Sequence, residues 1–186
     1  MSKEQASIPV PIVFIGGIYG SGKTTIVRSV AEHLGAASHS ASRLAEHSGL
    51  GDADASKAVL DVEGNQERLV RNLHAAVRVD PRLGLLDGHF CIFNRKLEIQ
   101  EIGIEVFRAI NARACVLVEC DLDAALARLN QRDGAQYSQE RLAELARRES
   151  MHAGRVCAAL SVPLVRCDSS ISEAAIAGMI RDALGQ

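Results

Sequence analysis

The chain has 186 residues, which is enough for one well-buried core and short for two. Its formal net charge of -2 and its aromatic content of 3% leave no broad basic surface and few base-stacking side chains, which argues against a dedicated nucleic-acid binder. No apolar stretch has the length or setting of a membrane span or a signal peptide, so neither insertion nor export is predicted. The composition favours one α/β domain that binds a small ligand.

The five cysteines are odd in number and include no C-x-x-C pair of the kind that binds zinc or performs redox chemistry. Cys115, Cys120 and Cys167 lie in apolar runs, where a free cysteine behaves as a small hydrophobe. The pattern predicts a reducing, cytoplasmic compartment.

The first predicted elements surround a glycine-rich stretch. Residues 10–15 form an apolar run typical of a buried strand, and residues 26–34 have the apolar spacing of a helix. Between them, residues 17–24 read Gly-Ile-Tyr-Gly-Ser-Gly-Lys-Thr, which matches the spacing G-x-x-x-x-G-K-[ST] of a phosphate-binding loop. We therefore predict a nucleoside triphosphate site formed by Gly17, Ile18, Tyr19, Gly20, Ser21, Gly22, Lys23, Thr24 and Thr25.

The physics of this loop explains its residue types. Glycines let the backbone curl so that several N–H groups point at phosphate oxygens, and the N-terminus of the next helix adds a positive dipole end. Lys23 is expected to reach the β and γ phosphates, and the Thr24 hydroxyl to ligate Mg²⁺. The alternative is a glycine-rich turn that binds nothing, but the flanking strand and helix are the context that the motif requires.

Turns and caps divide the middle of the chain. The expected elements are a helix ending at Gly35, a short strand at 36–40, a helix over 43–46, an exposed loop at 49–56 and a helix that starts at Gly64 or Asn65. A short apolar run then ends in Asp87-Gly88, which predicts a buried parallel strand with an acid at its carboxyl end. Two interpretations of residues 90–104 stay open, a surface hairpin and an irregular excursion.

The second half continues the alternation. It predicts a helix over 106–110, a strand over 114–119, a helix capped by Asp121, a polar loop over 131–138, a long helix after Ser138, a strand over 162–167 and a last helix with a Ser170–Glu173 capping box. Strands that alternate with helices predict a parallel sheet covered on both faces. Ligands bind such sheets beyond the carboxyl ends of the strands.

Asp87 is the candidate second anchor for the metal. An acid at the end of a buried strand in a phosphate-loop protein can hold Mg²⁺, often through water, opposite the Thr24 hydroxyl. The alternative is a simple turn, since Asp-Gly is a common turn pair. The apolar strand before Asp87 favours the metal, because it puts the carboxylate on the ligand side of the sheet.

Arg128 and Arg132 are four residues apart, so they share one helix face and lie next to the polar loop that follows. Two guanidinium groups at the rim of a phosphate site would neutralise charge on a transferring phosphoryl group. A solvated helix end is the alternative, which the phosphate-binding loop in the same chain makes less favoured.

The order of these motifs resembles that of P-loop nucleoside monophosphate kinases, in particular archaeal-type adenylate kinases and related small ATP-binding AAA proteins. The resemblance rests on residues 17–24, the run 85–89, the Arg128/Arg132 pair and the later Arg148 and Arg155, and it extends over most of the chain. It implies an α/β P-loop NTPase three-layer sandwich: a five-stranded parallel sheet with helices on both faces.

The resemblance also implies one domain, 1–186, with a short lid at about 131–139 and an acceptor-binding region at about 41–80. Arg43 would begin the acceptor-binding helix, while Arg148 and Arg155 match later arginines beside the lid, where alignments that use Arg147 fit equally well. Common bacterial adenylate kinases read D-G-F-P-R where this chain has His89 after Asp87-Gly88, which leaves the acceptor open. His89 could contact an acceptor or be a buried neutral donor, and Gln66 could read a base edge or only start a helix.

These features predict an ATP- and Mg²⁺-dependent phosphotransferase acting on a nucleoside monophosphate or another small acceptor. Lys23, Asp87, Arg128 and Arg132 are the expected catalytic residues, and Thr24 and Asp87 the metal ligands. An alternative is an ATP-binding or ATP-hydrolysing regulatory protein that switches a protein partner. A GTPase is disfavoured because no N-K-x-D guanine-reading motif is present.

Overall fold

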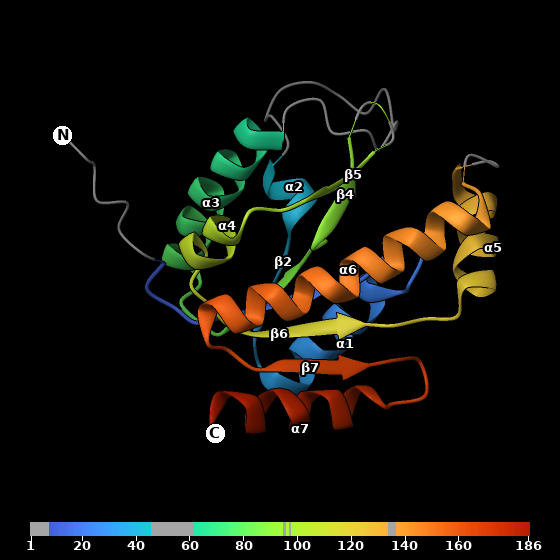
Figure 1. Ribbon diagram of the computed structural model, residues 1–186. Helices are drawn as coiled ribbons and strands as arrows, with labels where there is room; N and C mark the ends of the chain where they lie inside the picture. Colours follow the sequence, from blue (N-terminus) through green and yellow to red (C-terminus); the bar gives the residue numbers. More distant parts are fainter. Residues whose placement is uncertain (1–7, 46–61, 95, 97, 134–136) are drawn as a thin grey trace.

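The computed structural model describes residues 8–45, 62–94, 96, 98–133 and 137–186. A five-stranded parallel sheet forms its centre, with helices on both faces (Figure 1). The strand order is β2 (Ala37–Ser40), β3 (Gly84–Asp87), β1 (Ile12–Gly16), β6 (Ala112–Val118) and β7 (Leu164–Cys167). The predicted fold class is therefore confirmed. The loop predicted at 49–56 and residues 134–136 of the predicted lid lie outside the described residues.

Helices cover the sheet because its buried strands point apolar side chains to both faces. Val13 and Ile15 of β1 pack with α1 (Lys23–Leu34) and α7 (Glu173–Leu184). Ile12 and Phe14 pack on the opposite face with α3 (Val62–Val79), α4 (Ile104–Ala109) and α6 (Gln139–Leu160). The remaining helices are α2 (Ala41–Ala45) and α5 (Leu122–Asp133). Within the described ranges, each helix is too short or too polar to cross a bilayer.

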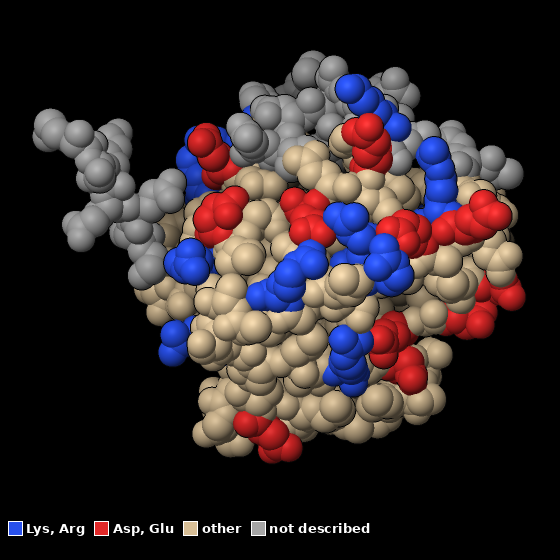
Figure 2. Space-filling model, in the orientation of Figure 1, with Lys and Arg blue, Asp and Glu red and all other residues tan. Residues whose placement is uncertain are grey.

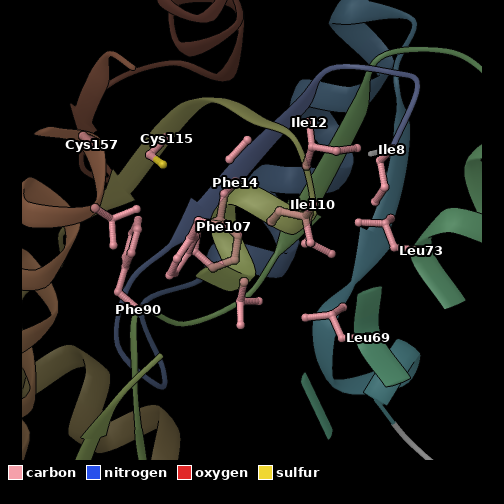
Figure 3. Close-up of a cluster of buried hydrophobic side chains, with 14 of the residues drawn as sticks. Ile8, Ile12, Phe14, Leu69, Leu73, Phe90, Phe107, Ile110, Cys115 and Cys157 are labelled. Carbon is pink, nitrogen blue, oxygen red and sulfur yellow. The ribbon is translucent and has the colours of Figure 1, made fainter. Parts of the chain in front are cut away.

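Three phenylalanine rings lie at the centre of the core between the sheet and helices α3, α4 and α6 (Figure 3). The ring centroid of Phe14 lies 4.9 Å from those of Phe90 and Phe107, in edge-to-face contacts that aromatic rings prefer. Phe90 directly follows the segment Asp87-Gly88-His89, so its burial anchors the chain at the end of β3. The core therefore fixes the backbone beside the predicted metal ligand.

Residues 90–104 contain a hairpin, as one of the two interpretations had it, but its first strand is buried rather than at the surface, with Cys91 and Phe93 0% and 3% exposed. β4 (Cys91–Phe93) pairs antiparallel with β5 (Ile99–Glu101). Glu101 joins the hairpin to α6, because its carboxylate accepts hydrogen bonds from Arg148 and Arg155, each at 2.7 Å. The hairpin thus lies against the long helix that follows the predicted lid (Figure 1).

Many predicted boundaries differ from the structure by a few residues, including the starts of α3 and α7. The helix expected from Gly64 or Asn65 already includes Val62, so the polar pair lies within its first turn. The last helix is capped by Ser172, whose extended backbone lets its hydroxyl accept from the Ala175 N–H. The predicted Ser170 cap is wrong, because the Ser170 hydroxyl donates to Asp168 in the preceding turn.

Candidate active site

A cavity of about 1100 Å³ opens at the carboxyl ends of the parallel strands. Among the predicted site residues, its lining includes Tyr19, Gly20, Ser21, Gly22, Lys23, Thr24, Thr25, Arg43, Gln66, Asp87, His89, Arg128 and Arg132. The volume slightly exceeds the roughly 300–1,000 Å³ of pockets that hold one drug-sized ligand. The cavity is therefore large enough for a nucleotide-sized ligand.

The loop backbone is pressed between strand β6 and helix α5. A side chain at Gly17, where φ is 147°, would come within 2.5 Å of the Val118 carbonyl oxygen. At Gly20, where φ is 75°, the same addition would meet the Ala125 carbonyl oxygen at 2.6 Å. Both glycines are needed because the positive φ values and the close neighbouring backbone leave no room for a Cβ.

Lys23 is buried beneath the loop, with 6% of its surface exposed. Its ammonium group donates to the carbonyl oxygens of Gly17 and Ile18, at 2.7 and 2.9 Å. Burial lowers the pKa of Lys23 from 10.5 to about 8, while the negative charges of Glu149 and Asp87 oppose that fall. The ammonium is thus held at the loop, beside the space that a phosphate would take.

Thr24 and Asp87 are in direct contact in the cavity wall, which is the proximity that the predicted metal site requires. The Thr24 hydroxyl donates to the Asp87 carboxylate at 2.7 Å, although the two residues are 63 positions apart. A hydroxyl and a carboxylate oxygen are hard ligands, which suit Mg²⁺ with water and substrate oxygens completing its shell. The pair therefore fits the expected metal, while among the described residues no cluster of three or more acidic, histidine or cysteine side chains forms a metal site by itself.

Arg128 and Arg132 both line the cavity from α5. The Arg128 guanidinium donates to the Gly20 carbonyl oxygen at 2.8 Å, which ties the helix to the loop. The positive charge of Arg132 is near enough to contribute to the lowered pKa of Lys23. The two arginines are thus within range of a phosphate group in the loop.

The remaining cavity wall includes residues that were predicted to hold the acceptor. Arg43 lies on α2, Gln66 on α3 and His89 just after β3. The His89 ring lies 4.3 Å from the Tyr19 ring, between centroids, and its Nδ1 is 3.8 Å from the Glu149 carboxylate. His89 therefore lies at the cavity with one ring nitrogen near Glu149, and its contact with an acceptor stays a prediction.

Arg148 and Arg155 lie elsewhere. Both donate to Glu101 of the hairpin, and neither is among the described residues that line the cavity. His152 completes this cluster through its hydrogen bond to the Ile102 carbonyl oxygen at 2.6 Å. These contacts favour a role in holding the hairpin to α6, so we leave both arginines out of the proposed acceptor site.

Sequence reasoning missed Glu149, a buried acid on α6. Only 1% of its surface is exposed, and its carboxylate accepts hydrogen bonds from the N–H groups of Gly17 and Phe90, each at 3.0 Å, and of Cys91. Its position between Leu145 and Ala153 on the apolar stripe of α6 was a usable signal, since an acid there must find buried partners.

Burial also controls the charge on Glu149. It raises the pKa of this carboxyl group from 4.5 to about 7, although the backbone N–H donors and the Lys23 charge pull the pKa down. Glu149 and Lys23 are thus two buried ionisable groups whose charged forms are each disfavoured by the interior.

We expect the free energy of unfolding to pass through a minimum between about pH 7 and pH 8 in the absence of ligand. The raised Glu149 pKa contributes stability that is complete below pH 4.5 and lost as pH rises through about 7. The lowered Lys23 pKa contributes stability that is complete above pH 10.5 and lost as pH falls through about 8. Because Lys23 and Glu149 also act on each other electrostatically, their titrations are coupled, and the direction of each change is the expected result.

Urea unfolding from pH 5 to pH 10 measures this profile. Glu149→Gln should remove the fall on the acid side and keep the rise on the alkaline side, whereas Lys23→Met should do the reverse. A Glu149→Gln curve that stays parallel to the wild-type curve below pH 7 would assign the acid-side change to another group.

The face that carries α6 shows basic and acidic side chains next to one another, without a continuous basic patch (Figure 2). This agrees with the near-neutral net charge of the sequence. Positive charge is instead concentrated in the cavity. Its described lining has one acidic side chain, Asp87, and five cationic ones: Lys23, Arg28, Arg43, Arg128 and Arg132.

The parallel sheet, the phosphate-binding loop and the cationic cavity define a P-loop kinase-like protein. A family model described as an AAA domain matches residues 16–146, and the chain belongs to this family. No curated protein matches the sequence.

Several solved structures share the fold. A tunicamycin resistance protein from Deinococcus radiodurans has 19% identity and a TM-score of 0.58, over 95% of this chain and 96% of that chain. A shikimate kinase from Acinetobacter baumannii, in complex with shikimate, has 16% identity and a TM-score of 0.56, over 96% and 95%. A sugar kinase from Janibacter has 16% identity and a TM-score of 0.53, over 95% of both chains. At identities of 16–19%, these similarities show a shared fold and nothing further.

Proposed function

We propose that the protein is an ATP- and Mg²⁺-dependent phosphotransferase that acts on a small acceptor, with a nucleoside monophosphate as the favoured class. One observation carries the proposal: the phosphate-binding loop, the Thr24–Asp87 pair and the Arg43, Gln66 and His89 side chains line one cavity. Two of the similar structures are a sugar kinase and a shikimate kinase, which supports this reaction class.

The charge of the cavity supports an anionic acceptor. Lys23, Arg128 and Arg132 are sufficient in number to face a triphosphate, yet the lining also includes Arg28 and Arg43. A second anionic group, such as the phosphate of a monophosphate acceptor, would pair with these two guanidinium groups. This excess of positive charge favours a phosphorylated acceptor over a neutral alcohol.

Each residue then has a role in positioning and charge stabilisation, which dominate phosphoryl transfer. Lys23 exchanges its two carbonyl partners for phosphate oxygens, and the loop N–H groups hold the β phosphate. The buried Ser21 hydroxyl, which has no hydrogen-bond partner within the described residues, supports a phosphate ligand here. Thr24 and Asp87 would hold Mg²⁺, which when bound neutralises charge on the β and γ phosphate oxygens.

The predicted lid at about 131–139 and acceptor region at about 41–80 are part of this proposal. Tyr19 of the loop stacks near Tyr137, with 6.2 Å between ring centroids, so the base of the lid contacts the donor site. A lid closing from this base would exclude water and suppress hydrolysis. The cytoplasmic location stays a prediction.

The test is incubation of the protein with γ-labelled ATP, Mg²⁺ and a panel of nucleoside monophosphates, sugars and hydroxy acids. Label on a monophosphate is the expected result, and Lys23→Ala prepared in parallel controls for a contaminating kinase. Label found only on a neutral alcohol would show that the acceptor is an alcohol and not a nucleoside monophosphate. Release of free phosphate at the same rate with and without every acceptor would favour the ATP-hydrolysing regulatory protein instead.

Arg132→Ala is expected to lower kcat about 100-fold, because it removes a guanidinium group from developing phosphoryl charge. Arg132→Lys should recover part of the rate, since the charge returns without the planar donor fork. Arg155→Ala, an arginine on α6 that pairs with Glu101, is the control and should stay within about threefold of wild type. The measurement is the initial rate of label transfer by each variant. Near-normal turnover by Arg132→Ala would show that Arg132 takes no part in the reaction.

A further inference from the structure

Helix α6 carries a carboxylate that touches the backbone on both sides of the candidate active site. The helix crosses one face of the sheet (Figure 1), and Glu149 lies near its middle. Gly17, the first residue of the phosphate-binding loop, is 132 positions away in sequence, while Phe90 and Cys91 are 59 and 58 positions away. Three distant parts of the chain therefore meet at one buried side chain.

The hydrogen bonds that Glu149 accepts favour its ionised form and so oppose the effect of burial, which still leaves the pKa raised to about 7. One oxygen accepts from the Gly17 and Phe90 N–H groups at 3.0 Å each, and the other accepts from Cys91. Among the described residues, these three backbone donors stabilise the carboxylate anion more than the protonated form. Hydrogen bonds to a charged group are about twice as strong as neutral ones, which helps offset the cost of burying the charge.

Other ionisable groups also face Glu149. Lys23 of α1 acts on it electrostatically, His89 Nδ1 lies 3.8 Å away, and the nearby Cys91 thiol and Tyr19 hydroxyl have pKa values raised by burial. Of these groups, Lys23 favours the ionised form of Glu149, because its positive charge lowers the Glu149 pKa. It belongs to the donor site, whereas His89 belongs to the proposed acceptor side.

We propose that Glu149 is a positioning residue that holds the donor loop and the segment after Asp87 in one fixed arrangement. Its bond to Gly17 fixes the start of the loop that carries Lys23 and Thr24. Its bonds to Phe90 and Cys91 fix the backbone that follows Asp87 and His89. The inference rests on the proposed phosphotransferase function, because it assigns the two sides of the site to donor and acceptor.

Glu149→Gln tests the role with little change in shape. The amide keeps one oxygen acceptor but turns an NH₂ group toward a backbone N–H donor, so part of the anchor is lost. We expect kcat to fall at least about tenfold while KM for MgATP changes less than about threefold, because misalignment affects reaction more than binding. Glu144→Gln, the same change at an exposed acid on the same helix, should leave both constants unchanged.

A second measurement does not depend on phosphoryl transfer. Hydrogen–deuterium exchange of the amides of Gly17, Phe90 and Cys91 should become at least about tenfold faster in Glu149→Gln, with the sheet amides of β6 unchanged. If Glu149→Gln does not fold, Glu149→Asp keeps the charge, withdraws the carboxylate by one methylene and is expected to show the same two effects.

The outcomes separate the two hypotheses. Wild-type protein that binds MgATP but transfers phosphate to no acceptor would overturn the proposed function, and the exchange experiment would then decide the role of Glu149 alone. Wild-type kcat in a folded Glu149 variant, or amide exchange as slow as in wild type, would overturn the positioning role even if phosphoryl transfer is established.

Discussion

Replacing Lys23 by methionine is expected to lower kcat by about 1000-fold or more, which corresponds to roughly 4 kcal/mol of lost transition-state stabilisation. The ammonium is already placed at the loop by the Gly17 and Ile18 carbonyl oxygens, so no other described cation duplicates its position there. Methionine has a similar length and no charge, and it suits a site that is 6% exposed. The fold should therefore survive while the chemistry is lost.

The measurement is the initial rate of label transfer from ATP at saturating substrate, with unfolding curves for the same preparations. Lys96→Met is the matched control, because Lys96 is exposed at the hairpin and lies outside the cavity lining. It should retain the wild-type rate. Full activity of Lys23→Met would exclude the loop from the reaction, whatever else the cavity binds.

Asp87→Asn is expected to lower kcat about 100-fold and to raise the Mg²⁺ concentration needed for half-maximal rate at least about tenfold. The amide oxygen can still accept the hydrogen bond that Thr24 donates at 2.7 Å, so the local geometry should persist. What disappears is the negative charge that a hard divalent cation prefers.

Rates measured against free Mg²⁺ check this result. Asp80→Asn is the control, since Asp80 pairs with Arg82 in an exposed ion pair away from the cavity. Its Mg²⁺ dependence should equal that of the wild type. If Asp87→Asn also follows the wild-type Mg²⁺ curve, Asp87 holds Thr24 but not the metal.

Local patterns accounted for much of the fold. The alternation of apolar runs and helical spacing predicted the parallel sheet, because each run is buried on both faces and each helix has one apolar side. Boundaries were less accurate: Ser170 and Ser172 both precede the last helix, and only backbone geometry shows that Ser172 caps it. The sequence pattern of residues 90–104 could not distinguish a hairpin from an irregular segment, because strands of three residues are too short to show a clear alternation.

For the candidate site, the sequence by itself determined the contiguous part. Residues 17–24 can be recognised as a phosphate-binding loop without the fold, because such a loop binds phosphate with neighbouring backbone groups and with side chains in the next helical turn. The strand before Asp87 was enough to predict its place opposite Thr24, because the carboxyl ends of parallel strands meet at one edge.

Only the tertiary structure decided which distant side chains join that loop. Arg148 and Arg155 matched a family pattern, yet their guanidinium groups pair with Glu101. Glu149, which no motif marks, reaches Gly17 across 132 positions because α6 packs over the sheet. Such contacts depend on where helices pack rather than on any local spacing, since a buried charge takes whichever donors the folded chain brings within hydrogen-bond distance.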